Sequence, residues 1–588
     1  MSKNTLLPIL LTLFLLQVIA QNKTENPLKN TFCNPLNIEY NFWRSSQKAP
    51  LVGKVSHREA ADPTIIVFKG TYYLFASHSS GYWWSKDLAT WNLIVPTTLG
   101  NVDAYAPSAA IYNDTLYLTG NGGRKMYCTA DPMNDDWKFV IQHKDVGDPC
   151  LFVDDDNKVY LYYGLTKGGP ISVVQLDPTN HFEKIEGTQK DLFSADALKH
   201  GCEAPEGGTE NKMAYEGAWM TKHNGKYYLE YAVPGTSSPF YNDSYYVSNS
   251  PTGPFTFGKN SPSSIKPTGF VAGAGHGSTF KDLNGNYWHV TTSIVCALYR
   301  FERRIALYPA HFDTQGLLYA DTYLGDYPQY NPGKAPQNAK NNFTGSMLLS
   351  YRKLVIASSS LPGFEAINIS DENVKTWWSA NTSNKGEWVM LNLEKPFEVG
   401  AIQINFAEQD IDSVKIRDLK YAFNYIVECS EKPSGPWKVI IDKSKNGRDL
   451  PHDYVPLDKL TKMQYIRVTN AGNVPANGKF AIRALRVFGL DKGSLPKEVK
   501  SLTAMREKKD RRMVTIKWTK VDNADGYIIR YGIGPNQLYN HYQILDNTKQ
   551  SLTLQTLNAE ANYYFAIDAY NKSGVKKNTK TVSERLIK

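Results

Sequence analysis

The chain contains few cysteines and no cysteine pattern that is typical of a zinc site. Its 588 residues include six cysteines, none of them in a Cys-x-x-Cys pair: Cys33, Cys128, Cys150, Cys202, Cys296 and Cys429. The wide spacing excludes a dense disulfide scaffold and a zinc ribbon, and leaves one or two disulfides open.

Two further features are missing: a concentrated block of one charge, and a long apolar run beyond the N-terminus. The formal net charge is only +9, and lysines and arginines are scattered along the chain. We therefore expect neither nucleic-acid binding nor insertion into a membrane.

The N-terminus has the pattern of an export signal. Lys3 provides a positive charge, Leu6–Ile19 is apolar, and Ala20 ends a cleavage site before Gln21. A membrane anchor is the alternative, but this apolar stretch is shorter than the 18 or more residues that a spanning helix needs. We predict a signal peptide over residues 1–20 and a secreted or periplasmic protein.

What the chain does have is length and aromatic residues. A chain of this size exceeds what one hydrophobic core supports, so several domains are expected. Hydrophobic residues make up 41% and aromatic residues 12%, including 37 tyrosines. This composition favours β structure and also suits surfaces that bind sugars.

A unit of two apolar strands joined by a polar turn recurs five times. Turns such as Lys69-Gly70 and Asn224-Gly225 have the residues that tight hairpins need. Repeats of several strands predict a five-bladed β-propeller over residues 21–335. The five copies are Asp62–Phe75, Pro107–Leu118, Asp148–Tyr163, Glu216–Leu229 and His276–Val290.

The residues that head the first strand of each copy should meet near the propeller axis. They are Asp62, Ser108, Asp148, Glu216 and His276. Three carboxyl groups from distant parts of the chain would then share one site. Glycosidic bond cleavage needs such a set, because one carboxylic acid donates a proton while a carboxylate activates water.

These motifs, in this order, resemble glycoside hydrolase family 43. The resemblance rests on Asp62-Pro63, Gly147-Asp148-Pro149, Glu216-Gly217 and Gly275-His276-Gly277-Ser278. It implies an inverting hydrolase of arabinofuranosides, xylosides or related galactosides. In that family's terms, Asp62 is the general base, Asp148 raises the pKa of the acid and orients it, and Glu216 is the general acid. An inverting pair should lie roughly 6.5–9.5 Å apart.

The same resemblance suggests residues around the catalytic set. His276 resembles the family's axial histidine, which implies a calcium ion held mainly by water, or an ordered water, in the channel; a purely structural, hydrogen-bonded histidine is the alternative. Arg303 resembles an arginine near the catalytic acid, with Arg304 as a rival. Tyr105, in Ala-Tyr-Ala-Pro, stands where many members have tryptophan, at the wall that binds substrate.

Some assignments come from residue type alone. Trp83 and Trp84 are candidates for stacking on a sugar ring. Glu203 and Glu206, in a loop before Glu216, are alternative acids that precede no apolar strand. The run Asp154–Asn157 lacks the spacing of a calcium-binding loop and is interpreted as an acidic hairpin turn.

The C-terminal half predicts two β-sandwich domains. Residues 345–491, with Trp377 and Trp378 as core or rim aromatics, resemble discoidin (coagulation factor 5/8 type C) domains, which commonly bind carbohydrate. Residues 496–588, with Trp518 as a core residue, resemble a fibronectin type III domain. The predicted fold class is all-β.

Three functions fit these features. The first is a glycoside hydrolase that acts on an oligosaccharide or polysaccharide. The second is a carbohydrate-binding protein without catalysis, and the third is a structural or adhesion protein. The set of Asp62, Asp148 and Glu216 favours the enzyme, because a lectin needs no carboxyl group with a raised pKa.

Overall fold

The structure, a computed structural model, describes residues 26–44, 56–100, 105–167, 169–203, 214–337, 339, 341–412 and 421–586. Within these ranges the chain forms β-strands and short 3-10 helices, and no α-helix. No helix in the described ranges is long and apolar enough to cross a membrane. The predicted all-β class is confirmed. The predicted signal peptide lies outside the described residues.

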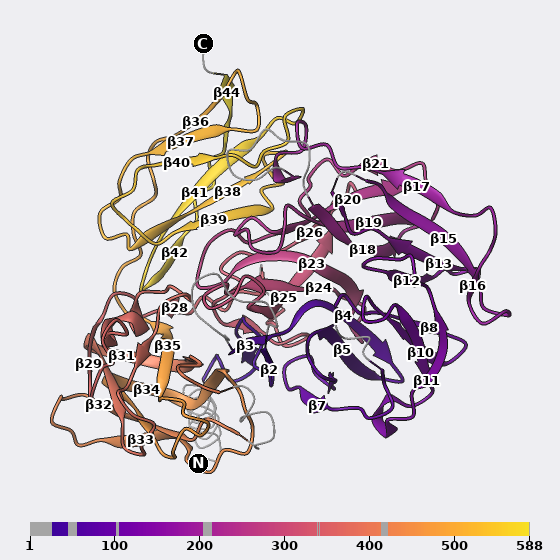
Figure 1. Cartoon of the computed structure of the whole chain (residues 1–588). Coiled ribbons are helices and arrows are strands. Elements are labelled where there is room, and N and C mark those ends of the chain that lie inside the picture. The colour runs from indigo at the N-terminus through magenta and orange to yellow at the C-terminus, as the bar shows by residue number, and fades with distance from the viewer. Residues whose placement is uncertain are drawn as a thin grey trace, which may run out of the picture.

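Five antiparallel sheets follow one another along residues 61–320 (Figure 1). The first is β4 (Ala61–Phe68), β5 (Thr71–Ser77), β6 (Tyr82–Ser85) and β7 (Asn92–Ile94). The second is β8 (Ser108–Tyr112), β9 (Thr115–Thr119), β10 (Lys125–Thr129) and β11 (Lys138–Gln142). The third is β12 (Cys150–Val153), β13 (Val159–Tyr163), β15 (Ile171–Asp177), β16 (Glu183–Lys184) and β17 (Lys190–Phe193).

The fourth and fifth sheets complete the set. The fourth is β14 (Thr166–Lys167), β18 (Ala214–His223), β19 (Lys226–Val233), β20 (Asn242–Ser248), β21 (Thr256–Phe257) and β22 (Ser264–Ile265). The fifth is β23 (Ala272–Lys281), β24 (Tyr287–Ile294), β25 (Arg303–Phe312) and β26 (Leu318–Ala320). Strands β4, β8, β12, β18 and β23 contact one another in a closed ring, β23 meeting β4. The sheets are the blades of a five-bladed propeller.

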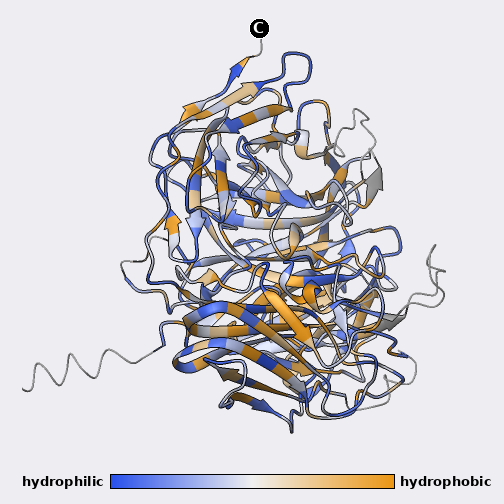
Figure 2. Ribbon diagram, turned by 90° about the vertical axis from the view of Figure 1, so that its left-hand side faces the viewer, coloured by the Kyte–Doolittle hydropathy of each residue, from blue (hydrophilic) through white to orange (hydrophobic). Residues whose placement is uncertain are grey.

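Turn chemistry and packing explain these blades. Lys69 and Gly70 have φ of 47° and 70°, and Asn224 and Gly225 have 48° and 74°, the left-handed values of a type I′ hairpin turn. Hydrophobic and hydrophilic residues alternate along many strands (Figure 2). The apolar sides of adjacent blades pack together, as where Phe75 of the first blade and Leu116 of the second share a cluster.

Residues 347–490, here named the middle domain, form one eight-stranded sheet. Its strands are β28 (Met347–Leu348), β29 (Leu354–Ala357), β30 (Trp378–Ser379), β31 (Trp388–Phe406), β32 (Tyr425–Ser430), β33 (Lys438–Lys443), β34 (His452–Asn470) and β35 (Ala481–Leu490). The register of β31 shifts near its centre, and residues of both its halves enter one core. The sheet therefore bends around that core, which contains Trp378.

Residues 502–586, here named the last domain, form two sheets around a shared core. One has β36 (Leu502–Arg506), β37 (Val514–Trp518), β40 (Ser551–Leu554) and β44 (Arg585–Leu586). The other has β38 (Gly526–Gly532), β39 (Asn540–Ile544), β41 (Tyr564–Asn571), β42 (Gly574–Lys576) and β43 (Val582–Ser583). Trp518 is buried in this core, as expected.

Two short strand pairs complete the chain. Strand β1 (Thr31–Phe32) pairs with β27 (Gln329–Tyr330), which joins the two ends of the propeller segment. Strand β2 (Asn41–Arg44) pairs with β3 (Ser56–Glu59), and Figure 1 shows this hairpin between the propeller and the middle domain. All six cysteines are free thiols, so neither of the two disulfides left open by the sequence forms.

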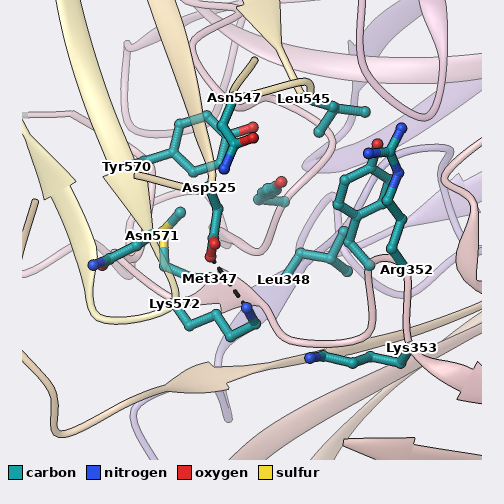
Figure 3. Close-up of a pocket in the computed structure, with 12 residues that line it drawn as sticks. Met347, Leu348, Arg352, Lys353, Asp525, Leu545, Asn547, Tyr570, Asn571 and Lys572 are labelled. Atoms are coloured by element: carbon teal, nitrogen blue, oxygen red, sulfur yellow. Dashed lines mark hydrogen bonds and ion pairs between the residues drawn. The ribbon is translucent and has the colours of Figure 1, made fainter. Parts of the chain in front are cut away.

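A cavity of about 220 Å³ lies where the propeller segment and the two C-terminal domains meet (Figure 3). Its charged side chains are largely paired: Lys572 lies 3.2 Å from Asp525, and Lys353 forms an ion pair with Glu394. Asn571 donates its amide protons to the backbone. The cavity is thus a junction whose polar groups mostly have partners within the protein.

Candidate active site

Five residues, one in each blade and either within the innermost strand or just before it, share a left-handed backbone. They are Asp62 (φ 50°), Ala106 (48°), Asp148 (47°), Gly217 (66°) and His276 (48°). Such a conformation is uncommon for residues with a Cβ and often marks a functional position. Residues with this conformation lie close together: His276 is beside Asp62, Asp148 and Gly217, and the Ala106 N–H donates to Ser77, which donates to Asp62.

This alignment corrects two of the expected positions. In the second blade the equivalent residue is Ala106, whereas Ser108 is buried inside the sheet and its hydroxyl accepts the N–H of Leu151. In the fourth blade it is Gly217, one residue after Glu216. A Cβ on Gly217 would lie 2.6 Å from the His276 ring. Only glycine fits there, and Glu216 therefore approaches the site from a neighbouring position.

Asp62 is a buried carboxylate surrounded by donors. Ser77 donates its hydroxyl to Oδ2 at 2.6 Å, and Arg303 donates Nη1 to Oδ1 at 2.8 Å. The Asp62 N–H donates to the Thr292 hydroxyl, which orients the backbone. Burial by itself raises the pKa of Asp62, but the charges of Arg303 and His276 outweigh it, and the pKa is lowered. Asp62 is therefore ionised at neutral pH.

Asp148 is buried but has the opposite electrostatic balance. Its N–H donates to Asn121 Oδ1 at 2.9 Å, and the Asn121 amide donates to its carboxyl group. Burial raises the pKa of Asp148. The charge of His276 lowers it, but the charges of Glu216 and Asp62 raise it further, and the resulting pKa is about 7. When carboxyl groups interact, an apparent pKa describes the whole group and not one residue. The site as a whole therefore retains a proton near neutral pH.

Glu216 lies on β18, partly buried, and accepts a hydrogen bond of 2.8 Å from the Tyr241 hydroxyl. Its charge acts on both Asp148 and His276, which places the three groups within electrostatic reach of one another. The expected separation of the Asp62 and Glu216 carboxyls stays a prediction.

His276 occupies the centre of the set. Its Nδ1 lies 3.3 Å from Asp62 Oδ1 and 3.9 Å from Asp148 Oδ2, and its backbone N–H donates to Asp243. Burial lowers the pKa of this imidazole, but Asp62, then Asp148 and Glu216, raise it further than burial lowers it. The surrounding carboxyl groups therefore hold the pKa of this imidazole above its ordinary value.

Two residues that the sequence analysis did not identify complete the base side of the site. Glu59 is fully buried and accepts two hydrogen bonds from Arg303, at 2.6 and 3.0 Å. His78 Nδ1 lies 2.7 Å from the other Glu59 oxygen. The charge of Arg303 outweighs burial and lowers the pKa of Glu59. The signal in the sequence was weak: Glu59 is three residues before Asp62, and His78 follows Ser77.

Arg303 itself is almost completely buried, between Glu59 and Asp62. It therefore contacts the proposed base, whereas the resemblance implied a place near the acid. Its donors are directed at the two carboxylates and at Thr236, and the predicted contact with substrate stays a prediction. The rival, Arg304, points the other way and donates to His452 of the middle domain.

The three aromatic residues that were predicted to bind substrate lie in different surroundings. Tyr105 is 39% exposed, with its ring 4.2 Å from that of His78, at the edge of the site. Trp83 is fully buried among residues of the first and fifth blades, so its assignment to substrate was wrong. Trp84 packs between the first and second blades, on the third strand out from the axis, and is also a packing residue.

The remaining candidates lie elsewhere. The side chains of Glu203 and Glu206 belong to the part of the chain that the structure does not describe. Asp154, in the acidic turn, accepts the Tyr227 hydroxyl at 2.6 Å and pairs with Lys222. The turn is thus tied to the fourth blade by protein partners, as expected of a structural hairpin.

No group of three or more His, Cys, Asp or Glu side chains in the described ranges is arranged to hold a metal ion. Nδ1 of His276 faces Asp62 and Asp148, which leaves Nε2 as the ring atom that could face an ion. An ion there would have one nitrogen ligand and water. This donor set fits a water-held calcium ion and does not fit a cage of protein ligands.

Known proteins resemble this chain over the propeller. Residues 54–318 match the profile of Glycosyl hydrolases family 43. A beta-xylosidase of Xylanibacter ruminicola is 31% identical over 128 residues, 19% of this chain and 39% of that protein. A beta-D-galactofuranosidase of Aspergillus niger is 26% identical over 271 residues, 39% of this chain and 72% of that protein.

The chain thus spans well under half the length of the xylosidase. Among solved structures, a xylan beta-1,4-xylosidase from Bacillus halodurans is similar at 13% identity and a TM-score of 0.38, covering 78% of this chain and all of that one. The assignment of the propeller therefore rests on the strand pairing of the five sheets and not on this similarity. Taken with the site geometry, the profile match identifies residues 54–318 as a glycosyl hydrolases family 43 domain.

Proposed function

We propose that this protein is a glycoside hydrolase that cleaves terminal glycosidic bonds with inversion of configuration. One observation carries the proposal: an ionised Asp62 and a carboxyl set that retains a proton, Asp148 with Glu216, lie around one histidine. Inverting hydrolysis requires this combination of a base and an acid. A binding protein has no use for it.

Each of the catalytic residues has one role in the proposed hydrolysis. Asp62 accepts a proton from water while the water oxygen bonds to the anomeric carbon of the sugar. The bond from that carbon to the leaving oxygen breaks, and Glu216 transfers its proton to that oxygen. The proton gained by Asp62 balances the one lost by Glu216. Asp148 keeps a proton in the acid pair, and Arg303 with Ser77 fixes the base.

The sugar is proposed from the relatives. The names of similar proteins include beta-xylosidase, xylosidase/arabinosidase and beta-D-galactofuranosidase. We expect turnover of at least one among aryl arabinofuranoside, xyloside, galactofuranoside and galactoside. The purified full chain would be assayed with all four, with Asp62→Asn as the blank. Equal, background rates for the native protein and the blank on every substrate would instead favour a carbohydrate-binding protein.

The pH profile tests the acid pair. Activity needs one proton on the pair, so it should fall as pH rises through the apparent pKa, about 7 for Asp148. Asp148→Asn removes the carboxyl group whose pKa is raised. The alkaline limb of kcat/KM should therefore move to lower pH. Asp155→Asn, an exposed carboxyl on a turn of the same blade, is the control. A limb that stays in place would contradict the coupling.

We further propose a calcium ion in the channel beside His276, held mainly by water. Support comes from the ring nitrogen Nε2, which is not directed at Asp62 or Asp148. Isothermal titration with calcium chloride should show one site in the chelator-treated native protein and none in His276→Ala. Equal heats for both proteins would remove the ion from this place.

The remaining assignments concern the other segments. We propose a secreted protein with its signal peptide removed after Ala20, a discoidin-like domain over residues 345–491 and a fibronectin type III-like domain over residues 496–588. The bent core of the middle domain and the two-sheet core of the last domain support the latter two. Mass spectrometry of the exported protein should find Gln21 at its N-terminus, and an intact Lys3 would contradict this.

A further inference from the structure

Two segments beside the proposed base, strand β3 and the start of β25, contact the site on one side and the middle domain on the other. Strand β3 carries Glu59 toward the site, and β25 begins with Arg303. Successive side chains of an extended strand point in opposite directions. Arg58 and Arg304, the neighbours of these two residues, accordingly point into the middle domain. The segments are also bonded to each other, since Arg304 donates to the Arg58 carbonyl at 2.6 Å.

Arg58 is held by carboxylates of the middle domain. Its Nε lies 2.8 Å from Glu408, and its two terminal nitrogens bind Asp449 at 2.7 and 2.9 Å. The Arg58 and Glu408 side chains are fully buried. A bidentate pair fixes both distance and orientation, so Arg58 cannot turn without losing several bonds.

Glu302, which precedes Arg303, is held in the same way. Its Oε1 lies 2.7 Å from Arg483, which also binds Glu408 at 3.1 Å, with all three side chains fully buried. Arg304 donates to His452 at 2.7 Å. The burial of His452 and the charge of Arg304 lower the pKa of this imidazole, so the neutral ring accepts the bond. Separating any of these partners would leave a buried charge uncompensated.

We propose that the middle domain positions residues of the active site. Its positioning residues are Arg483, Glu408, Asp449 and His452. They hold Arg58, Glu302 and Arg304, and these fix the two segments that carry Glu59 and Arg303. Arg303 in turn binds Asp62 Oδ1 at 2.8 Å. The domain thus acts on catalysis through rigid contacts, over a sequence separation of more than a hundred residues. The kinetic part of this proposal rests on the proposed hydrolase function.

Arg486 offers a matched control, three residues further along β35. It is equally buried, pairs with Glu372 at 2.6 Å and donates to the Asp326 carbonyl. None of these partners adjoins Glu59 or Arg303 in the chain. Arg483→Met and Arg486→Met each remove a buried arginine that joins the middle domain to the propeller segment. Both should lower the melting temperature, but only the first disturbs the catalytic base.

The experiment compares both variants with the native full chain, well below their melting temperatures. Arg483→Met should lower kcat by about 10–100-fold with little change in KM, as expected of a small misplacement of catalytic groups. The loss should be equal for good and poor leaving groups, because water activation is affected. Arg486→Met should keep a native kcat. Equal losses in both variants, or none in either, would overturn the proposal.

Two further variants keep the proposal testable if Arg483→Met fails to fold, and crystal structures keep it testable if no turnover is found. Glu302→Gln combined with Arg483→Met removes both charges and should fold while keeping the defect, and Arg483→Lys should restore part of kcat. Crystal structures give a readout without activity: the Arg303–Asp62 contact should be lost in the Arg483→Met variants and kept in Arg486→Met. An unchanged contact in all would overturn the proposal, whereas an inactive native protein would count against the hydrolase function alone.

Discussion

Replacing Asp62 by asparagine should reduce turnover by about 10²–10⁴-fold, the usual value of general base catalysis. Asparagine has nearly the same shape as aspartate but cannot accept the proton of the attacking water. Because water is activated whatever group leaves, aryl glycosides with good and with poor leaving groups should lose rate equally. Steady-state kinetics with a dinitrophenyl and a methylumbelliferyl glycoside would measure both losses.

A matched control separates this effect from a general loss of acidic charge. Asp145 is a mostly exposed carboxyl of the propeller, paired with Lys184. Asp145→Asn should keep native kinetics, since surface pairs contribute little. Native rates in Asp62→Asn would show that another group activates the water, and Glu59, the other carboxylate bound to Arg303, would then be changed to glutamine.

Replacing Glu216 by glutamine should have a loss of similar size but a different pattern. The variant keeps the shape of the acid and lacks its transferable proton. Substrates with poor leaving groups should lose about 10²–10⁴-fold, whereas dinitrophenyl glycosides need little protonation and should lose much less. Binding of the substrate should survive in both the Asp62 and the Glu216 variants, as equilibrium titration would measure.

The contrast between the two variants is the informative result. Equal losses for all leaving groups in Glu216→Gln would remove this residue from the role of acid. The carboxyl that retains a proton near neutral pH, Asp148, would then be the next candidate. Undiminished turnover of every substrate in both variants would contradict the whole assignment of the site.

Much of this protein followed from local sequence. Turn residues such as Lys69-Gly70 and Asn224-Gly225 adopt the left-handed values that a hairpin needs, because glycine and its neighbour specify a turn within four residues. Asp62, Asp148 and His276 occupy equivalent, strained positions because they head the same unit in three blades. A repeat makes such equivalence visible in the sequence, before any contact is known.

Other features depended on which strands became neighbours. Alternation shows that Trp83 has a buried or an exposed side, but only the packing of the first blade on the fifth decides that it is buried. The place of Glu216 follows from the space that the His276 ring takes beside Gly217, a contact between two blades.

The sequence by itself determined the repeating strands, the hairpin turns and the identity of three groups at the site, because each depends on residues close together in the chain. Tertiary structure alone decided the electrostatics. The lowered pKa of Asp62 and the raised pKa of Asp148 come from burial and from charges on other blades. Likewise, Arg58 and Glu302, the chain neighbours of Glu59 and Arg303, pair with Glu408 and Arg483 of a domain that follows much later in the chain. Charge interactions depend on distance in space, which the order of residues does not contain.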